Sequence, residues 1–178
     1  ILSKLQTFTQ PMILIPGNHD QCSAGINEFH SLTPLQHAYR VDHGRLPGLL
    51  IFSHPTIFQR ALWIPHIRSP AIVESVLQRD HDEHPIQAVF CHADVTGAYM
   101  NDNILSQGGV PPKLFPPNIP IYSGHFHKPH VVQQQNRTIE YLGSPYEISL
   151  SEAQQAKALV VLDGSTWECI ERIPLNLG

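Results

Sequence analysis

Several short, mainly apolar runs of residues are the feature that most limits how this chain can fold. The runs cover residues 12–15, 49–52, 61–64, 86–91 and 119–123. Each run is shorter than a typical helix and is bounded by proline, glycine or polar residues. Such runs are typical of strands that are buried on both faces of a largely parallel sheet. Apolar residues at helical spacing predict helices at residues 1–10 and 71–78, so we expect an α/β fold.

The pattern changes after residue 131, where shorter apolar segments alternate with turn signals. These segments cover residues 138–142, 158–163 and 167–173. They predict an antiparallel β ending, with Asp163-Gly164 as one of its turns. The proline-rich stretch at residues 109–120 is expected to be an irregular loop. With 178 residues and 42% hydrophobic content, the chain suits one globular domain with a real core.

Composition excludes some classes of protein and leaves others open. The formal net charge of -4 gives no broad basic surface, so composition neither indicates nor excludes binding to DNA. Three widely spaced cysteines argue against a disulfide framework and predict an intracellular, reducing compartment, with each cysteine a small buried residue. No apolar run approaches the length of a membrane span, so we expect no membrane partner.

Polar residues follow three of the predicted strands directly. The three segments are Gly17-Asn18-His19-Asp20, His92-Ala93-Asp94 and Gly124-His125-Phe126-His127. Because strand ends in an α/β fold converge on one crevice, we expect one shared site. Alternation along an extended segment would send His125 and His127 to the same side. Imidazole nitrogens and an amide oxygen suit manganese, iron or zinc better than calcium.

Asn18, His19 and Asp20 make chemical sense as a unit. The amide oxygen of Asn18 can bind a metal ion, while the imidazole of His19 reaches a phosphate or a leaving group. The carboxylate of Asp20 would then orient His19 and keep it protonated.

In this order, Gly-Asn-His-Asp, a strand-end histidine and Gly-His-x-His resemble the third, fourth and fifth motifs of the calcineurin-like metallophosphoesterases. The resemblance implies a four-layer α/β/β/α sandwich with mixed sheets. It implies that Asn18, His92 and His125 bind one metal ion and that His127 binds another. His19 resembles the histidine that protonates the leaving oxygen or steadies the transition state, and Asp20 would assist it.

That family also carries Asp-x-His and Gly-Asp-x-x-Asp motifs upstream of Gly-Asn-His, and residues 1–16 contain neither. We therefore expect residues 1–178 to be the C-terminal portion of one such domain, without its N-terminal part. The intact domain is expected to hold two divalent ions, manganese first, with iron or zinc as alternatives. A metal-bound hydroxide would attack phosphorus in line. The portion alone is expected to bind at most one ion weakly and to hydrolyse nothing quickly.

Further segments look like the branch of DNA-repair nucleases of the Mre11 and SbcD type. These segments are Leu62-Trp63-Ile64-Pro65, His92-Ala93-Asp94-Val95-Thr96-Gly97, the Gly124 to His130 stretch and Tyr141-Leu142-Gly143-Ser144-Pro145-Tyr146. The resemblance implies DNA phosphodiesters as substrate and an SMC-like ATPase as partner. Two alternatives stay open: a protein phosphatase or small-nucleotide phosphodiesterase of the same superfamily, and a degenerate, non-catalytic binding domain.

Several other polar and aromatic residues have a functional and a plain structural interpretation. His54 and His66 are interpreted as core or loop residues, and residues 80–84 as a solvated loop. His130 and Asp94 either support a ligand imidazole or lie on the surface. Lys128 either contacts a phosphate or lies on the surface, and Tyr99 and Tyr146 either stack on a base or pack.

Overall fold

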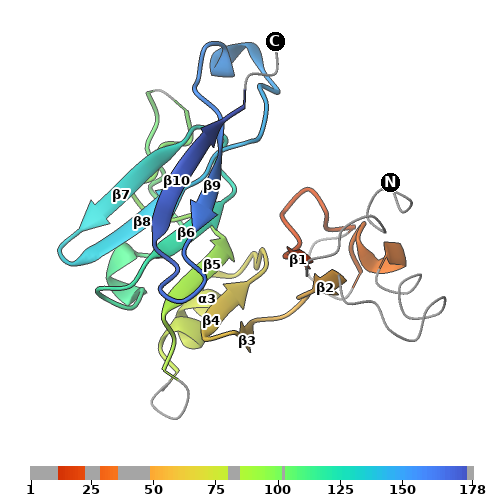
Figure 1. Cartoon of the computed structure of the whole chain (residues 1–178), viewed down its shortest axis with the longest axis vertical. Coiled ribbons are helices and arrows are strands. Elements are labelled where there is room, and N and C mark those ends of the chain that lie inside the picture. The colour runs from red at the N-terminus through yellow and green to blue at the C-terminus, as the bar shows by residue number, and fades with distance from the viewer. Residues whose placement is uncertain (1–11, 23–28, 36–48, 80–84, 102, 176–178) are drawn as a thin grey trace.

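The computed structural model describes residues 12–22, 29–35, 49–79, 85–101 and 103–175. The helix expected at residues 1–10 and the polar cluster at residues 80–84 lie outside the described residues. The described part has the α/β character that the sequence predicts, with a mixed six-stranded sheet at its centre (Figure 1).

The six-stranded sheet combines four parallel strands with two antiparallel edges. Its spatial order is β3 (Thr56–Phe58), β4 (Ala61–Ile64), β5 (Ala88–His92), β6 (Ile121–Gly124), β8 (Arg137–Tyr141) and β7 (His130–Gln134). Strands β4, β5, β6 and β8 run parallel, whereas β3 and β7 are antiparallel to their neighbours. The strands predicted at residues 61–64, 86–91 and 119–123 are therefore confirmed.

The central strands of this sheet are covered on both faces, which explains why they are mainly apolar. In β4, Leu62 and Ile64 belong to one hydrophobic cluster, and Ala61 and Trp63 belong to another. Helix α3 (Pro70–Leu77) covers the first face with Val73, Val76 and Leu77. It begins at a proline, whose fixed φ suits the first helical position.

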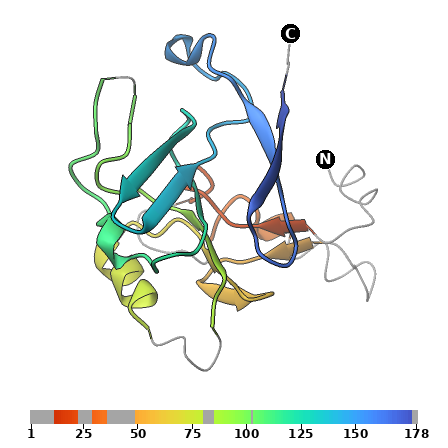
Figure 2. The ribbon, with the colours of Figure 1, turned by 60° about the vertical axis from the view of Figure 1, so that its left-hand side comes forward.

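The second face is covered by two small two-stranded sheets. Parallel strands β1 (Met12–Leu14) and β2 (Leu49–Ile51) form one, and antiparallel strands β9 (Ala158–Leu162) and β10 (Cys169–Pro174) form the other. Trp63 stacks on Phe90 with ring centroids 4.2 Å apart, and Trp167 in the β9–β10 turn meets Trp63 edge-on at 6.1 Å. Ile13 of β1 packs in the same cluster. Figure 2 shows β9 and β10 on the side of the sheet away from α3.

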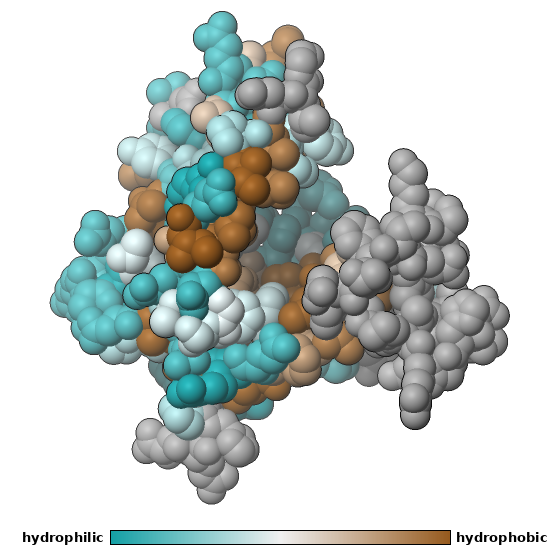
Figure 3. Space-filling model, in the orientation of Figure 1, coloured by the Kyte–Doolittle hydropathy of each residue, from teal (hydrophilic) through white to brown (hydrophobic). Residues whose placement is uncertain are grey.

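The C-terminal half follows the predicted antiparallel pattern in part. The pairs β7–β8 and β9–β10 are antiparallel as expected, but β8 also lies parallel to β6. The proline-rich loop contains one turn of 3-10 helix, η1 (Pro112–Leu114), and a second such turn, η2 (Leu150–Glu152), follows β8. Leu159, Ile170 and Ile173 are exposed on the β9–β10 hairpin, and Figure 3 shows apolar and hydrophilic residues mixed on that side.

The cysteines correct one prediction. Cys91 in β5 is buried, but Cys22 and Cys169 are exposed, so the expectation that each cysteine is buried is wrong for two of them. Cys22 follows the loop after β1, and Cys169 opens a strand whose residues are all exposed. Among the described residues, no helix has both the length and the apolar character needed to span a membrane.

Candidate metal centre

Loops that follow β1, β4, β5 and β6 border one cleft of about 530 Å³. Its polar lining consists of Asn18, His19, His66, Arg68, Asp94 and His125. The parallel strands β4, β5 and β6 bring their carboxyl ends to the same edge of the sheet. The backbone N–H of His66 donates to the carbonyl of Pro16 at 2.8 Å, which ties the β4 loop to the Asn18 loop.

The ring of His92 packs closely against two glycines beside the cleft. A Cβ atom at Gly17 would lie 2.8 Å from His92 Cε1, and one at Gly124 would lie 2.8 Å from His92 Nδ1. Only glycine therefore leaves room for the ring on these two sides. His92 Nε2 lies 2.8 Å from Asn18 Oδ1. Two adjacent ligands about 2.1 Å from one ion are about 3 Å apart at a right angle, so this spacing fits a shared ion.

His66 completes a group of three histidines that the sequence interpretation did not assemble. Its Nδ1 lies 3.3 Å from the carbonyl oxygen of His92 and donates to it, which leaves Nε2 as the ligand nitrogen. Its ring is stacked on that of His125 with centroids 5.7 Å apart. One ligand nitrogen from each of His66, His92 and His125 lies within 4.8 Å of the other two, so the group could hold a metal ion.

His125 supplies the clearest sign that the cleft is built for a ligand. Its Nδ1 is buried and has no hydrogen-bond partner among the described residues. A buried polar atom without a partner is costly, and a bound ion would remove that cost. His125 also has a φ of +94°. The segment after Gly124 is therefore not extended, so alternation along a strand does not place His125 and His127 on the same side.

The three imidazoles are held in the form that binds metal. Burial, together with the neighbouring His125 and His66, lowers the pKa of His92 to about 3. Burial also lowers the pKa of His125 and of His66. All three rings are therefore neutral at pH 7, with lone pairs available for an ion.

The lowered pKa of His92 predicts that the metal-free protein loses stability in weak acid. The unfolded chain takes up a proton near pH 6.5, whereas folded His92 does so only near pH 3. The contribution of His92 to the free energy of unfolding is therefore greatest above pH 6.5, and it is lost as the pH decreases towards 3. Through His92 alone we expect a loss of about 2 kcal/mol between pH 6.5 and 5. Urea denaturation at several pH values measures it, and an equally steep slope in His92→Gln would contradict this origin.

His19 and Asp20 occupy different surroundings from those expected. His19 is exposed and lines the cleft. Asp20 Oδ2 accepts a hydrogen bond from Gly17 N at 2.8 Å, and Oδ1 accepts one from Ser31 Oγ at 2.8 Å. Within the described ranges, no hydrogen bond joins Asp20 to His19. The carboxylate of Asp20 closes the turn that carries Asn18.

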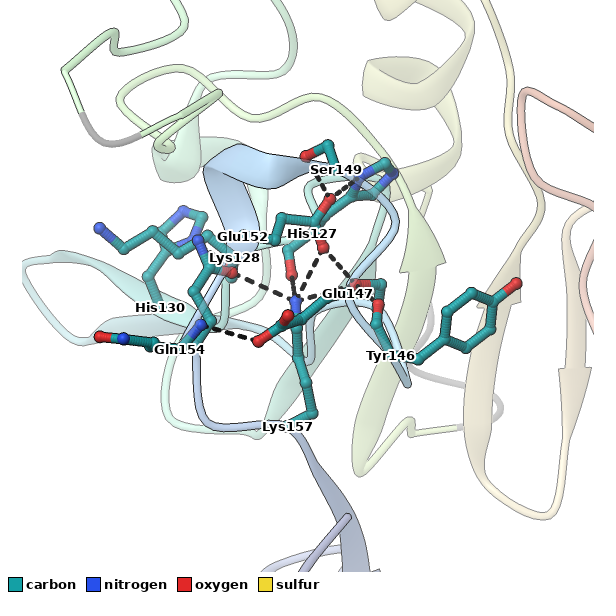
Figure 4. A network of polar contacts seen from close by, with 11 residues as sticks. His127, Lys128, His130, Tyr146, Glu147, Ser149, Glu152, Gln154 and Lys157 are labelled. Atoms are coloured by element: carbon teal, nitrogen blue, oxygen red, sulfur yellow. Dashed lines mark hydrogen bonds and ion pairs between the residues drawn. The ribbon is translucent and has the colours of Figure 1, made fainter. Parts of the chain in front are cut away.

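His127 lies outside the group of three histidines, beside a buried ion pair. Its Nδ1 is 3.1 Å from Glu152 Oε1, and Glu152 Oε2 is 3.0 Å from Lys157 Nζ (Figure 4). Burial acts to raise the pKa of Glu152, but hydrogen bonds from Lys157 and from Ser144 outweigh it, and the pKa is lowered to about 2. Glu152 is therefore ionised at neutral pH.

The structure places both His130 and Asp94, whose interpretations were open. His130 Nδ1 donates to the carbonyl of Lys128 at 2.8 Å, and its Nε2 accepts from the backbone N–H of Tyr99 at 2.9 Å. His130 therefore links two loops. Asp94 lines the cleft, and its Oδ1 is buried with no hydrogen-bond partner in the described part of the chain. Asp94 faces the site rather than the surface.

The remaining open residues lie at the periphery. Lys128 Nζ lies 5.4 Å from the ring centroid of Tyr99. Tyr146 is 56% exposed and its ring points away from the Glu152 network (Figure 4). His54 is exposed in the loop between β2 and β3, as the loop interpretation predicts.

Sequence reasoning missed His66, Arg68, Glu152 and Lys157. The signal for His66 was present, because it follows the buried strand β4 as His92 ends β5 and His125 follows β6. Arg68 stands two residues further along the same loop. Glu152 and Lys157 carried no local signal, since their burial depends on tertiary packing.

Comparison with known proteins gives no evidence for the chemistry of the cleft, so its geometry is the structural evidence. No family model matches the sequence, and no curated protein matches it.

Proposed function

We propose that this chain is part of a metal-dependent phosphoester hydrolase, with DNA phosphodiesters as its substrate class. The observation that carries the proposal is that Asn18, His66 and His125 line one cleft. His92 lies behind them, 2.8 Å from Asn18 Oδ1 and in one group with the two other histidines. The resemblance of the three strand-end segments to the calcineurin-like metallophosphoesterases supports the same chemistry. With it we propose a four-layer sandwich and, as in the nuclease branch, an SMC-like ATPase as partner.

The residues of the cleft fit a divalent ion. The set offers three neutral nitrogens and one amide oxygen, which suit manganese, iron or zinc. When bound, the ion supplies Lewis-acid polarisation of a phosphoryl oxygen and lowers the pKa of water. The backbone carbonyl of His92 fixes the His66 ring, and the two glycines fix the His92 ring, so little reorganisation is needed. We propose manganese as the ion, and His127 as a ligand of a second ion.

Two further side chains in the cleft suit a phosphoester substrate. His19 is exposed at the cleft, where a protonated imidazole can give a proton to a leaving oxygen. Arg68 lines the same cleft and is also exposed, so its guanidinium can pair with a phosphate oxygen. A cleft with a ligand group, a proton donor and a cation has the parts that phosphoester hydrolysis requires.

The test is manganese-dependent release of nucleotides from linear duplex DNA by the native-length protein. We expect His19→Ala to lower the rate by about 10²–10⁴-fold, the usual contribution of a positioned proton donor. His54→Ala is the matched control, because His54 is also an exposed histidine after a strand but lies outside the cleft lining. Turnover of a small phosphoester without nucleotide release would replace the DNA substrate with a small one. No hydrolysis of either would contradict the proposal.

A further inference from the structure

A network of buried charges surrounds His127 rather than the cleft itself. Lys157 and Glu152 form an ion pair whose side chains are only 4% and 5% exposed. Lys157 Nζ also donates to the carbonyl oxygen of His127 at 2.8 Å and lies 2.9 Å from Ser144 Oγ. Figure 4 shows His127, Glu152 and Lys157 lying close together.

This network contacts both the backbone carbonyl and the ring of His127. The backbone carbonyl of His127 accepts from Lys157 Nζ and from the backbone N–H of Ser144, the latter at 3.0 Å. The ring of His127 has its Nδ1 3.1 Å from Glu152 Oε1. Glu152 in turn accepts from Ser149 Oγ at 3.1 Å. The backbone position and the ring direction of His127 are therefore set together.

Stability alone does not account for such a pair. A buried ion pair is often no more stabilising than apolar residues of the same size, because both charges lose their hydration. An ionised carboxylate that accepts from an imidazole N–H also has a specific effect, since it selects which ring nitrogen carries the proton. An ionised Glu152 can only accept at this contact, which favours a proton on Nδ1 and a lone pair on Nε2. The side chain of His127 is 40% exposed, so this lone pair can reach a ligand.

We propose that Glu152, anchored by Lys157, is a positioning residue that fixes the ring and the tautomer of His127 for binding through Nε2. This inference rests on the proposed function for the role of His127 as a ligand of the second ion. The Gly143-Ser144-Pro145-Tyr146 segment helps to hold His127 through Ser144. The backbone N–H of Ser144 donates to the His127 carbonyl, and Ser144 Oγ donates to Glu152 Oε2 at 2.9 Å.

The test reads the tautomer of His127 in the metal-free chain, by long-range proton–nitrogen NMR of the imidazoles. The His127 signals are assigned from their loss in His127→Gln. The informative variant is Glu152→Leu combined with Lys157→Met, which replaces the pair with apolar side chains of similar size and is expected to stay folded. The matched control is Glu147→Gln, because Glu147 accepts from Gln154 N in the same loop at 2.7 Å. Within the described part of the chain, no hydrogen bond or ion pair joins Glu147 to His127.

We expect His127 to carry its proton on Nδ1 in the wild type and in Glu147→Gln, and mainly on Nε2 in the double variant. A retained Nδ1 proton in a folded double variant overturns the inference. Affinity of the native-length protein for Zn²⁺ is measured in parallel, and we expect a loss of about 10–100-fold for the second ion. A changed tautomer with unchanged affinity would support positioning by Glu152 but refute the role of His127 as a ligand, so the two failures are distinguishable.

Discussion

Replacing His125 with glutamine is expected to weaken binding of Mn²⁺ or Zn²⁺ to this chain by about 100-fold. Four ligands together supply about 10–16 kcal/mol in structural zinc sites, or roughly 3 kcal/mol for each ligand, which is about 100-fold in Kd. The variant should fold normally, because His125 Nδ1 has no hydrogen-bond partner to lose among the described residues. Isothermal titration of the metal-free protein measures the change.

His66→Gln should weaken binding to a similar extent, since His66 offers its nitrogen to the same group. His54→Gln is the control, because that exposed histidine lies after β2 and outside the group. Unchanged affinity in both His125→Gln and His66→Gln would show that the ion binds elsewhere.

The contrast between His92 and His66 shows what the sequence could and could not reveal about the site. His92 and His125 are predictable from the sequence because they end or follow buried strands. His66 follows a buried strand in the same way, but Pro65 stands between it and β4, and no motif includes it. Its contact with the His92 carbonyl depends on the parallel pairing of β4 and β5, which the sequence does not specify.

Lys157→Met is expected to lower the free energy of unfolding by about 3–5 kcal/mol, the usual effect of leaving a buried charge unpaired. Lys157 Nζ contacts the Glu152 carboxylate at 3.0 Å in surroundings where both side chains are almost fully buried. Without the ammonium, the carboxylate keeps its burial and loses its cation. Urea denaturation of the metal-free chain at neutral pH measures the loss.

The combination of Glu152→Leu with Lys157→Met should recover most of that stability, because no unpaired charge is then buried. Lys113→Met is the control at an exposed lysine, where we expect a change within about 0.5 kcal/mol. A single variant as stable as the control would mean that Glu152 is solvated in solution, and the buried network would be wrong.

The strands were predictable because their environment is uniform. Strands β4 and β5 pack on both faces, so most of their residues are apolar, and a mainly apolar run is visible in the sequence. The separation of β1 and β2 into their own sheet was not predictable, because their runs look the same. Pairing of β8 with β6 was also hidden, since a hairpin strand can join a sheet in either direction.

Backbone geometry explains where the side-chain predictions failed. The expectation that His125 and His127 share one side assumed an extended segment, but the φ of +94° at His125 ends the strand at Gly124. Asp20 was expected to orient His19, but its two oxygens satisfy donors at Gly17 and Ser31. Both cases depend on local turns that residue types alone do not determine.

The most direct test of the metal centre is an anomalous difference map from a crystal of this chain grown with Mn²⁺. We predict one peak within bonding distance, about 2.0–2.3 Å, of Asn18 Oδ1 and of nitrogens from His92, His125 and His66. A peak elsewhere, or none at this cleft under saturating manganese, would contradict the account.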